Sequence, residues 1–288
     1  MYNEQIQSSS NFIRSVYSDK ENNIWLGTHN NGLYILNRKN NTFRKAGFGN
    51  QSIFYIYDLG GGNTLICSSE GVSLVEMANN EIRVLSSYIS YAFFYACKSS
   101  NEILWLASLN GVIKARILNG KLQLEKAYSR ESKPSISFNN CRVLFYDKEE
   151  NELLAGTEGG GLNVLKLNDN QEVTAVDVYK KNDTSNSISN NYIRSITKDS
   201  NGDLWIGTYE GLNKLLRKSV LGGIAFKSYT NRDGLPNNMI QSLVEDNDKE
   251  LWIGTNGGLS RFDSKNEQFV NYSVSDGLQS NEFSEHTV

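Results

Sequence analysis

Four polar side chains recur at one position of this sequence, and their chemistry suits the binding of a carboxylate. Each stands five residues before an aspartate, and the four are Arg14, Arg142, Arg194 and Gln241. A guanidinium group presents paired N–H donors that match a carboxylate, and an amide adds a further donor. Two interpretations stay open. Either each side chain bonds carbonyl groups of a neighbouring structural unit, or together they form a ring of donors that binds an acidic or carboxylated sugar.

Residues that would support catalysis form no comparable pattern. An aspartate turn followed by a tryptophan strand is similar to the Asp-box of sialidases, but the sequence has no Arg-x-Pro start motif. Glycoside hydrolysis generally needs two carboxylates a few ångströms apart, and no acidic pair is singled out by its position. His29 and His286 are interpreted as loop residues and not as phosphate acceptors. We therefore predict no catalytic residue, no cofactor and no metal ligand, with a sialidase-like glycosidase as one alternative.

The elements that would position these residues come from an internal repeat. The phrase at residues 191–215, NYIRSITKDSNGDLWIGTYEGLNKL, returns at 238–262 and at 11–35. The copies align on a tryptophan or leucine at positions 25, 65, 105, 154, 205 and 252, which gives spacings of 40, 40, 49, 51 and 47 residues. A period in this range is typical of β-propellers, in which each repeat forms one four-stranded blade.

Each repeat contains four short apolar runs, which we predict to be strands. In the fifth repeat they span 193–198, 204–208, 212–216 and 224–229. They are rich in β-branched and aromatic residues and are bounded by glycine, asparagine and aspartate. We expect the recurring aspartate to fix the turn after the first run, and a glycine to supply positive φ after the second. The aligned tryptophan or leucine is predicted to pack between neighbouring blades.

We predict an all-β fold, with a single β-propeller domain over residues 1–288 and six recognisable four-stranded blades. The predicted blade ranges are 11–47, 51–87, 91–129, 138–181, 190–230 and 237–273. Residues 274–288 repeat the linker and the first strand, so we expect the start of a further blade there. The chain is therefore expected to be a fragment of a seven-bladed or tandem propeller. The alternative is a closed ring of six blades with the tail across its seam.

Composition and charge exclude several other classes of protein. The 29 basic and 32 acidic residues are intermixed and give a net charge of −3, which argues against a nucleic-acid partner. The longest apolar stretch, 91–96, is too short to span a bilayer, so no membrane contact is expected. Residues 1–5 lack a signal-peptide pattern, so the chain is either cytosolic or an excised piece of a larger protein. The three cysteines are interpreted as small buried hydrophobic residues: Cys67, Cys97 and Cys141.

The phrase D-x-x-G-x-L-W-I-G-T-x-x-G-L-x-[KR] at Asp199–Lys214 and the linker Asp233–Asn238 resemble the two-component regulator propeller repeat. The resemblance is weak in the second and third units. The second to fourth units depart from the pattern, because Leu65 and Leu154 replace tryptophan and Cys67-Ser68 and Ala107-Ser108 replace Gly-Thr. It implies the periplasmic sensor region of a hybrid two-component system of Bacteroides-type bacteria, in a receptor anchored in the inner membrane. Such a region would detect oligosaccharides released from glycans. Its partners would be that ligand, a neighbouring propeller, a β-sandwich domain and a second receptor copy, while histidine kinase activity would belong to the parent polypeptide.

We therefore predict a non-catalytic ligand-sensing module for signal transduction, and a propeller scaffold for protein–protein interaction is the alternative. The links that enter a blade and the turns between its second and third strands open on the same side. Amide and aromatic side chains on these loops suit a neutral, hydroxyl-rich ligand. The predicted ligand-binding residues are Arg14, Asn31, Arg142, Asn190, Asn191, Arg194, Tyr209, Glu210, Asn237, Asn238 and Gln241.

Overall fold

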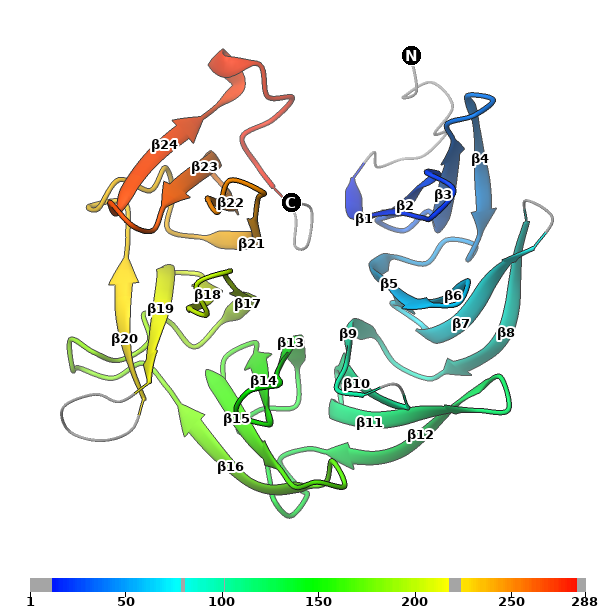
Figure 1. Ribbon diagram of the computed structural model, residues 1–288, viewed down its shortest axis with the longest axis horizontal. Helices are drawn as coiled ribbons and strands as arrows, with labels where there is room; N and C mark the ends of the chain where they lie inside the picture. Colours follow the sequence, from blue (N-terminus) through cyan, green and yellow to red (C-terminus); the bar gives the residue numbers. More distant parts are fainter. Residues whose placement is uncertain (1–11, 79–80, 101, 218–223, 284–288) are drawn as a thin grey trace. The chain divides into compact units, whose positions relative to one another are not determined.

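The computed structural model describes residues 12–78, 81–100, 102–217 and 224–283, and nearly all of its regular structure is β-strand. These residues form six four-stranded sheets, and in each sheet the strands lie in chain order (Figure 1). The predicted all-β fold of six four-stranded propeller blades is confirmed. The chain divides into two compact units, residues 1–127 and 128–288, with three blades in each. The single domain expected over the whole chain stays a prediction.

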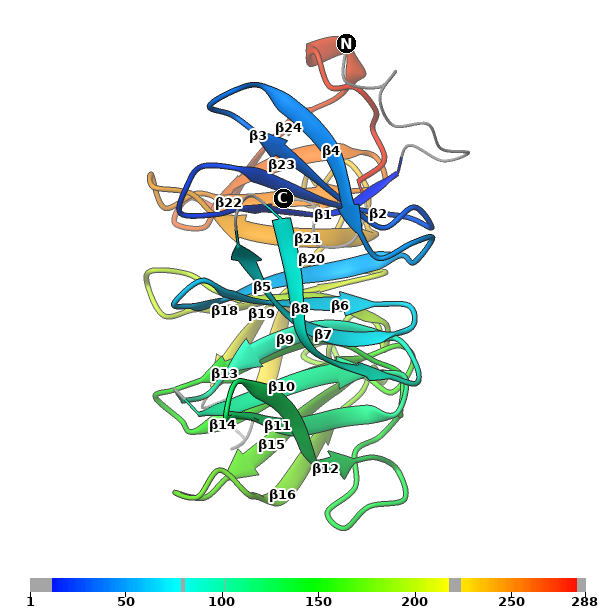
Figure 2. The same ribbon diagram turned by 90° about the vertical axis from the view of Figure 1, so that its right-hand side faces the viewer.

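Unit 1 contains blades 1 to 3, which follow one another from top to bottom in Figure 2. Their first strands are neighbours, because β1 contacts β5 and β5 contacts β9. The strands are β1 (Ile13–Ser18), β2 (Ile24–Thr28), β3 (Leu33–Asn37), β4 (Thr42–Gly47), β5 (Ile53–Gly60), β6 (Asn63–Ser68), β7 (Gly71–Ala78), β8 (Glu81–Ile89), β9 (Phe93–Lys98), β10 (Ile103–Ser108), β11 (Gly111–Leu118) and β12 (Lys121–Tyr128), whose last residue belongs to unit 2.

Unit 2 contains blades 4 to 6 and repeats this arrangement, since β13 contacts β17 and β17 contacts β21. The fourth strands lie at the opposite edges of their sheets (Figure 1). The elements are β13 (Cys141–Asp147), β14 (Glu152–Thr157), β15 (Leu162–Leu167), β16 (Val173–Tyr179), β17 (Ile193–Lys198), β18 (Leu204–Thr208), β19 (Gly211–Arg217), β20 (Ile224–Tyr229), β21 (Ile240–Glu245), β22 (Leu251–Thr255), β23 (Gly258–Asp263), β24 (Gln268–Tyr272) and the 3-10 helix η1 (Val274–Asp276).

The recurring aspartate fixes the first turn of a blade, as predicted, and also binds the aligned tryptophan. In blade 5, Asp199 Oδ1 accepts the backbone N–H groups of Asn201 at 3.0 Å and Asp203 at 2.8 Å. Its other oxygen, Oδ2, accepts the indole N–H of Trp205 at 2.8 Å. The same indole bond joins Trp25 to Asp19 and Trp252 to Asp246. In blade 6 this bond, followed by backbone N–H groups, lowers the pKa of the Asp246 carboxyl below its ordinary value.

Blades without the tryptophan–aspartate pair supply other partners. Asp58 accepts the backbone N–H of Gly60 at 2.7 Å and a hydrogen bond from the hydroxyl of Tyr17, which lies in blade 1. Asp147 forms an ion pair with Lys198 of blade 5 at 3.1 Å. In blade 3 the indole of Trp105 donates to Ser99 at 3.0 Å. Where the motif departs from the pattern, its polar groups therefore still have hydrogen-bond partners, and two of them lie in neighbouring blades.

The second turn of each blade depends on a glycine and a hydroxyl group. Gly211 has a φ of 139°, and a Cβ there would lie 2.5 Å from the carbonyl oxygen of Tyr229. Thr208, which ends β18, donates its hydroxyl to the carbonyl of Gly211 at 3.0 Å. The other five blades make the same bond, through Thr28, Ser68, Ser108, Thr157 and Thr255. The predicted positive φ is confirmed at Gly32, Gly71, Gly111, Gly161, Gly211 and Gly258.

A second glycine lets successive blades approach closely. A Cβ at Gly207 would lie 2.6 Å from Cγ2 of Ile240, at the start of the next blade, and 2.3 Å from the Ser195 hydroxyl. Gly156 faces Ile193 of blade 5 in the same way, with its Cβ position 2.6 Å away. The Gly-Thr pair of the repeat therefore has two separate roles, one in packing between blades and one in the turn.

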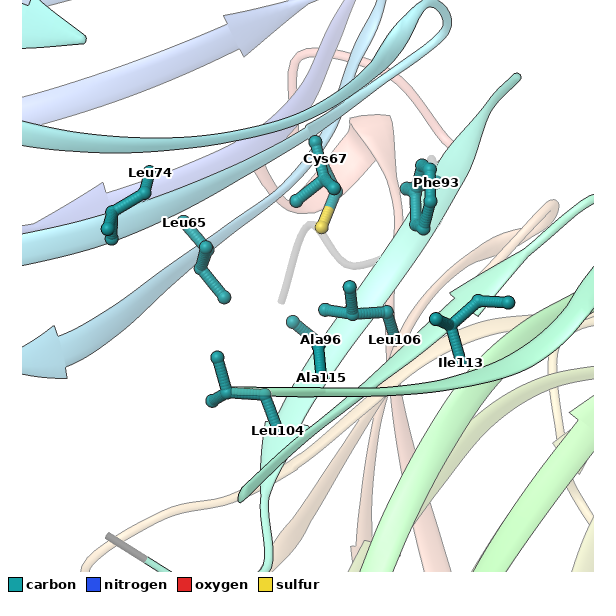
Figure 3. Packing of buried hydrophobic residues seen from close by; sticks show 10 residues of the cluster. Leu65, Cys67, Leu74, Phe93, Ala96, Leu104, Leu106, Ile113 and Ala115 are labelled. Atoms are coloured by element: carbon teal, nitrogen blue, oxygen red, sulfur yellow. The ribbon is translucent and has the colours of Figure 1, made fainter. Parts of the chain in front are cut away.

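Apolar layers between blades form the core, as the aligned side chains predict. Trp25, Trp105 and Trp205 are at most 1% exposed, whereas Trp252 is half-buried. Between blades 2 and 3, Leu65 packs with Phe93 and Leu104, and the Cys67 sulfur points into the same layer (Figure 3). Burial raises the pKa of the Cys67 thiol. All three cysteines are free thiols, with Cys67 and Cys141 buried as predicted and Cys97 half-buried.

The segment after β24 repeats the linker that leads into blade 6. Ser273 binds the Asp276 carboxylate through its backbone N–H at 2.9 Å, just as Thr230 binds Asp233 at 2.8 Å. Asn281 then accepts the backbone N–H of Val274 at 2.8 Å. The further blade predicted over 274–288 stays a prediction, because its expected strand falls largely on residues 284–288, outside the described residues. Residues 1–11, which include the first residue of the first predicted blade, also lie outside them.

We predict that Asp199→Ala lowers the free energy of unfolding by about 2–3 kcal/mol, because it removes the acceptor of a buried indole and of two turn amides. The control is Asp263→Ala, since Asp263 binds the turn amides of Lys265 and Asn266 but no tryptophan. That variant should lose about 1 kcal/mol or less. Urea denaturation measures both values, and equal losses would show that the indole bond contributes nothing.

Candidate functional site

A β-bulge occurs at the same position in the first strand of every blade. In blade 5, Ile193 pairs with Thr208 and Ser195 pairs with Gly207, so Arg194 is left out of the ladder. A bulge of this kind re-aims one side chain, and bulges are common beside functional sites. The six bulge residues are Arg14, Phe54, Phe94, Arg142, Arg194 and Gln241.

The sequence pattern identified four of these six positions. It missed Phe54 and Phe94 because blades 2 and 3 lack the regular spacing between this position and the aspartate of the turn. A better signal is the residue that follows the buried apolar residue at the start of the first strand. Ile53 and Phe93 occupy that starting position and are both 0% exposed.

In unit 1 the bulge residues form a cationic and aromatic group. The guanidinium of Arg14 lies 5.3 Å from the ring centroid of Phe54, and that ring lies 5.0 Å from Phe94. Arg14 Nε donates to His29 Nδ1 at 3.1 Å. Burial and the charge of Arg14 lower the pKa of His29, which favours the neutral imidazole that this bond requires. Asn31 is buried nearby, where it donates to the Tyr34 hydroxyl and accepts from Lys45.

In unit 2 one carboxylate joins two bulge arginines. Glu158 directly follows β14, and its Oε2 lies 3.1 Å from Arg142 Nε of the same blade. Its Oε1 lies 3.0 Å from Arg194 Nη2 of blade 5. Asn140 donates to Oε2 at 2.6 Å. Arg194 is only 6% exposed, so this ion pair links the two blades in a largely desolvated place.

Two stacked tyrosines lie beside this ion pair, and one of them is exposed. The rings of Tyr192 and Tyr209 stack with centroids 5.1 Å apart and planes within 10° of parallel. Tyr209 accepts a hydrogen bond from Arg194, whose guanidinium carbon lies 4.7 Å from its ring centroid. Tyr192 is 41% exposed. Tyr209 was predicted from its place in the repeat, whereas Tyr192, which stands immediately before the first strand of blade 5, was not.

Polar residues of the linker into blade 5 lie beside this pair. Lys181 forms an ion pair with Glu210, and the hydrogen bond from Lys181, followed by one from Asn190, lowers the pKa of Glu210. Asn190 accepts the N–H of Tyr192 at 2.8 Å, and Asn191 accepts that of Lys181 at 2.8 Å. The two amides therefore shape the backbone that presents Tyr192. A hollow of about 530 Å³ lined by Lys181, among other residues, adjoins this linker.

Three predicted residues lie instead at the entrance of blade 6. Asn237 accepts the N–H of Met239 at 2.8 Å, and Asn238 accepts that of Asn231 at 2.7 Å. Gln241 donates to Asn256 at 2.7 Å. The structure thus brings one group of the predicted residues together in unit 2: Arg142, Asn190, Asn191, Arg194, Tyr209 and Glu210. We call these six residues, together with Glu158 and Tyr192, the tyrosine rim.

The links of the rim are held by buried aliphatic side chains. Ile136 and Ile188 are 3% and 0% exposed, and each lies in the linker that enters blade 4 or blade 5. Asn213 accepts the backbone N–H of Ser189 at 2.9 Å and fixes the second linker to β19. Among the described residues, no group of three or more His, Cys, Asp or Glu side chains could hold a metal ion. No helix of the described segments is long and apolar enough to cross a membrane.

Comparison with protein families decides the nature of the repeat. The family described as two component regulator propeller matches residues 7–30, 187–210 and 234–257. The chain contains two-component regulator propeller repeats. The matched segments include both the turn aspartate and the tryptophan in blades 1, 5 and 6, so the resemblance predicted from those blades is confirmed. A comparison with curated proteins gave no match.

Solved structures with the same fold include an extracellular domain of a two-component system and proteins of other kinds. One is described as the extracellular domain of a hybrid two component system from B. thetaiotaomicron, with 19% identity, a TM-score of 0.59, and coverage of 95% of this chain and 48% of that one. Another is PorZ, a surface component of the type-IX secretion system of Porphyromonas gingivalis. It has 10% identity and a TM-score of 0.69, and the match covers 95% of this chain and 43% of that one. The β-propeller domain of Cps50 (Swd1) from Myceliophteria thermophila has 12% identity and a TM-score of 0.65. That match covers 92% of this chain and 87% of the other. This chain thus spans about half the length of the extracellular domain from B. thetaiotaomicron.

We predict that Arg194→Met lowers the free energy of unfolding by about 2–4 kcal/mol, because it leaves Glu158 without its partner in blade 5. Lys227→Met is the control, since Lys227 forms an ion pair with Glu267 in which both side chains are nearly half exposed. Its loss should stay below about 1 kcal/mol. Chemical denaturation of both variants compares them, and an unchanged stability of Arg194→Met would contradict the role of Glu158 as a link between blades.

Proposed function

We propose that this chain is a non-catalytic ligand-sensing module of a two-component sensor, and that it binds an oligosaccharide at the tyrosine rim. The observation that carries the proposal is the exposed, stacked Tyr192–Tyr209 pair directly beside a set of charged hydrogen-bonding groups. Aromatic faces pack against the apolar C–H surface of a sugar ring, while polar side chains around them fix its hydroxyl groups.

The rim is also pre-organised, which favours binding. The amide N–H groups of Gly159 and Gly161 both donate to the carbonyl of Asn191, at 3.1 and 2.9 Å. The turn after β14 is therefore tied to the linker that carries Tyr192. Because these loops are already ordered, little conformational entropy has to be lost when a ligand binds.

The sensory part of the proposal is supported by the two-component regulator propeller repeats. By the same argument we propose an extracytoplasmic location, in the periplasm, and a parent polypeptide with a second propeller, a β-sandwich and a histidine kinase. The ligand would act by favouring one of two conformations of that receptor, since a ligand shifts an equilibrium only by its difference in affinity for the two states.

A second candidate function, a scaffold for protein partners, is favoured by one feature of unit 1. The fourth strand of blade 2, β8, exposes Val84, Tyr88 and Ile89 by 51%, 40% and 77%. Exposed apolar side chains on a sheet edge are suited to contact another protein. This surface lies in the other unit from the tyrosine rim, so variants distinguish the two functions.

We predict that Tyr192→Ala weakens binding of a neutral oligosaccharide at least about tenfold, on the order of 1.4 kcal/mol, because the exposed stacking face is lost. Tyr88→Ala is a matched control, since Tyr88 is 40% exposed and Tyr192 is 41% exposed. Calorimetric titration with a panel of neutral oligosaccharides measures the effect on the member that binds best to the wild type.

The control should leave that affinity unchanged. If both variants bind the oligosaccharide as tightly as the wild type, the tyrosine rim is not the ligand site. If Tyr88→Ala alone weakens binding, the surface of β8 takes its place.

A further inference from the structure

The two arginines of the tyrosine rim already hold a carboxylate that belongs to the protein. Each oxygen of Glu158 faces a different guanidinium group, with Arg194 at 3.0 Å and Arg142 at 3.1 Å. Asn140 adds an amide donor to the same carboxylate at 2.6 Å. Paired guanidinium donors around a carboxylate form the arrangement expected of an anion site. Here the anion is internal.

An external carboxylate would have to compete with this internal one. Glu158 is tethered next to the arginines, so its effective concentration there is high. Its side chain is 23% exposed, so displacement would leave a largely desolvated carboxylate without its charged donors. Such a group is costly to leave unpaired. An acidic ligand therefore gains little from the arginines, because it has to displace the carboxylate that already lies between them.

The remaining groups of the rim do not restore an anion site. Glu210, the second carboxylate of the rim, forms an ion pair with Lys181 of the adjoining linker, so this cation too is paired with a carboxylate of the protein. The exposed edges of such ion pairs can still bind the hydroxyl groups of a sugar. The carboxylate accepts hydrogen bonds from them, and the cation donates hydrogen bonds to them. The aromatic face of Tyr192 adds a surface that depends on no charge.

We infer that Glu158 determines specificity at the tyrosine rim: it occupies Arg142 and Arg194, so that the site takes neutral saccharides and discriminates against those that carry a carboxylate. This inference rests on the proposed function, which it deepens by naming the ligand class. For Arg142 and Arg194 it replaces both interpretations of this position that the sequence left open. The arginines do bind a carboxylate, but the protein supplies it.

The test compares wild type with Glu158→Gln and with the control Glu210→Gln, which removes a rim carboxylate that does not face these arginines. The probes are a neutral oligosaccharide, the same oligosaccharide with one primary alcohol oxidised to a carboxylate, and acetate. We expect wild type to bind the neutral probe at least about tenfold more tightly than the oxidised one. Glu158→Gln should bind the oxidised probe at least about tenfold more tightly than wild type does, and it should lose the preference for the neutral probe over the oxidised one. Glu210→Gln should show no such gain.

Two results would overturn the inference without touching the proposed function: wild type that prefers the oxidised probe, or Glu158→Gln that gains no affinity for it. If no saccharide binds but Glu158→Gln gains affinity for acetate, the oligosaccharide proposal fails while occupation of the arginines by Glu158 is supported. Circular dichroism verifies the folding of each variant. Glu158→Asp, which keeps the charge but shortens its reach, serves the same comparison with a smaller expected gain and less disturbance of the fold.

Discussion

A buried indole N–H needs a hydrogen-bond acceptor, and in blades 1, 5 and 6 the acceptor is the aspartate that also closes a turn. Asp199 binds two turn amides through one oxygen and Trp205 through the other. The bond therefore joins a local turn to the side chain that fills the space between two blades. Because the tryptophan has one orientation, the next blade packs in one place, where Gly207 lets Ile240 approach. The positions of the loops therefore depend on these three contacts, from the turn to the aspartate, from the aspartate to the tryptophan, and from one blade to the next.

The bulge in each first strand is where this scaffold can vary. Its residue is excluded from the strand ladder, so its type can change without changing the pairing of the blade. Unit 1 places an arginine and two phenylalanines there, and unit 2 places two arginines and a glutamine. The same backbone position thus produces an aromatic group in one unit and an ion pair through Glu158 in the other.

Local patterns in the sequence were enough to predict the strands, the aspartate turns and the positive-φ glycines, because each depends on residues close together in the chain. Four features could not be predicted in this way. The indole bond depends on a side-chain orientation, and the bulge shifts the register without a composition signal at Phe54 or Phe94. The pairing of Arg194 with Glu158 joins residues 36 positions apart on different blades. Tyr192 was missed because its stacking on Tyr209 exists only after the two loops meet.

The central claim is that a rigid repeat scaffold binds its ligand on the loops of unit 2. Amide hydrogen exchange of the wild-type chain, with and without a saturating neutral oligosaccharide, tests it most directly. The account predicts slower exchange in residues 158–161, 189–192 and 209–211, with unchanged exchange in the strands of blades 1 to 3. Protection centred on β8, or a uniform change across all blades, would contradict it.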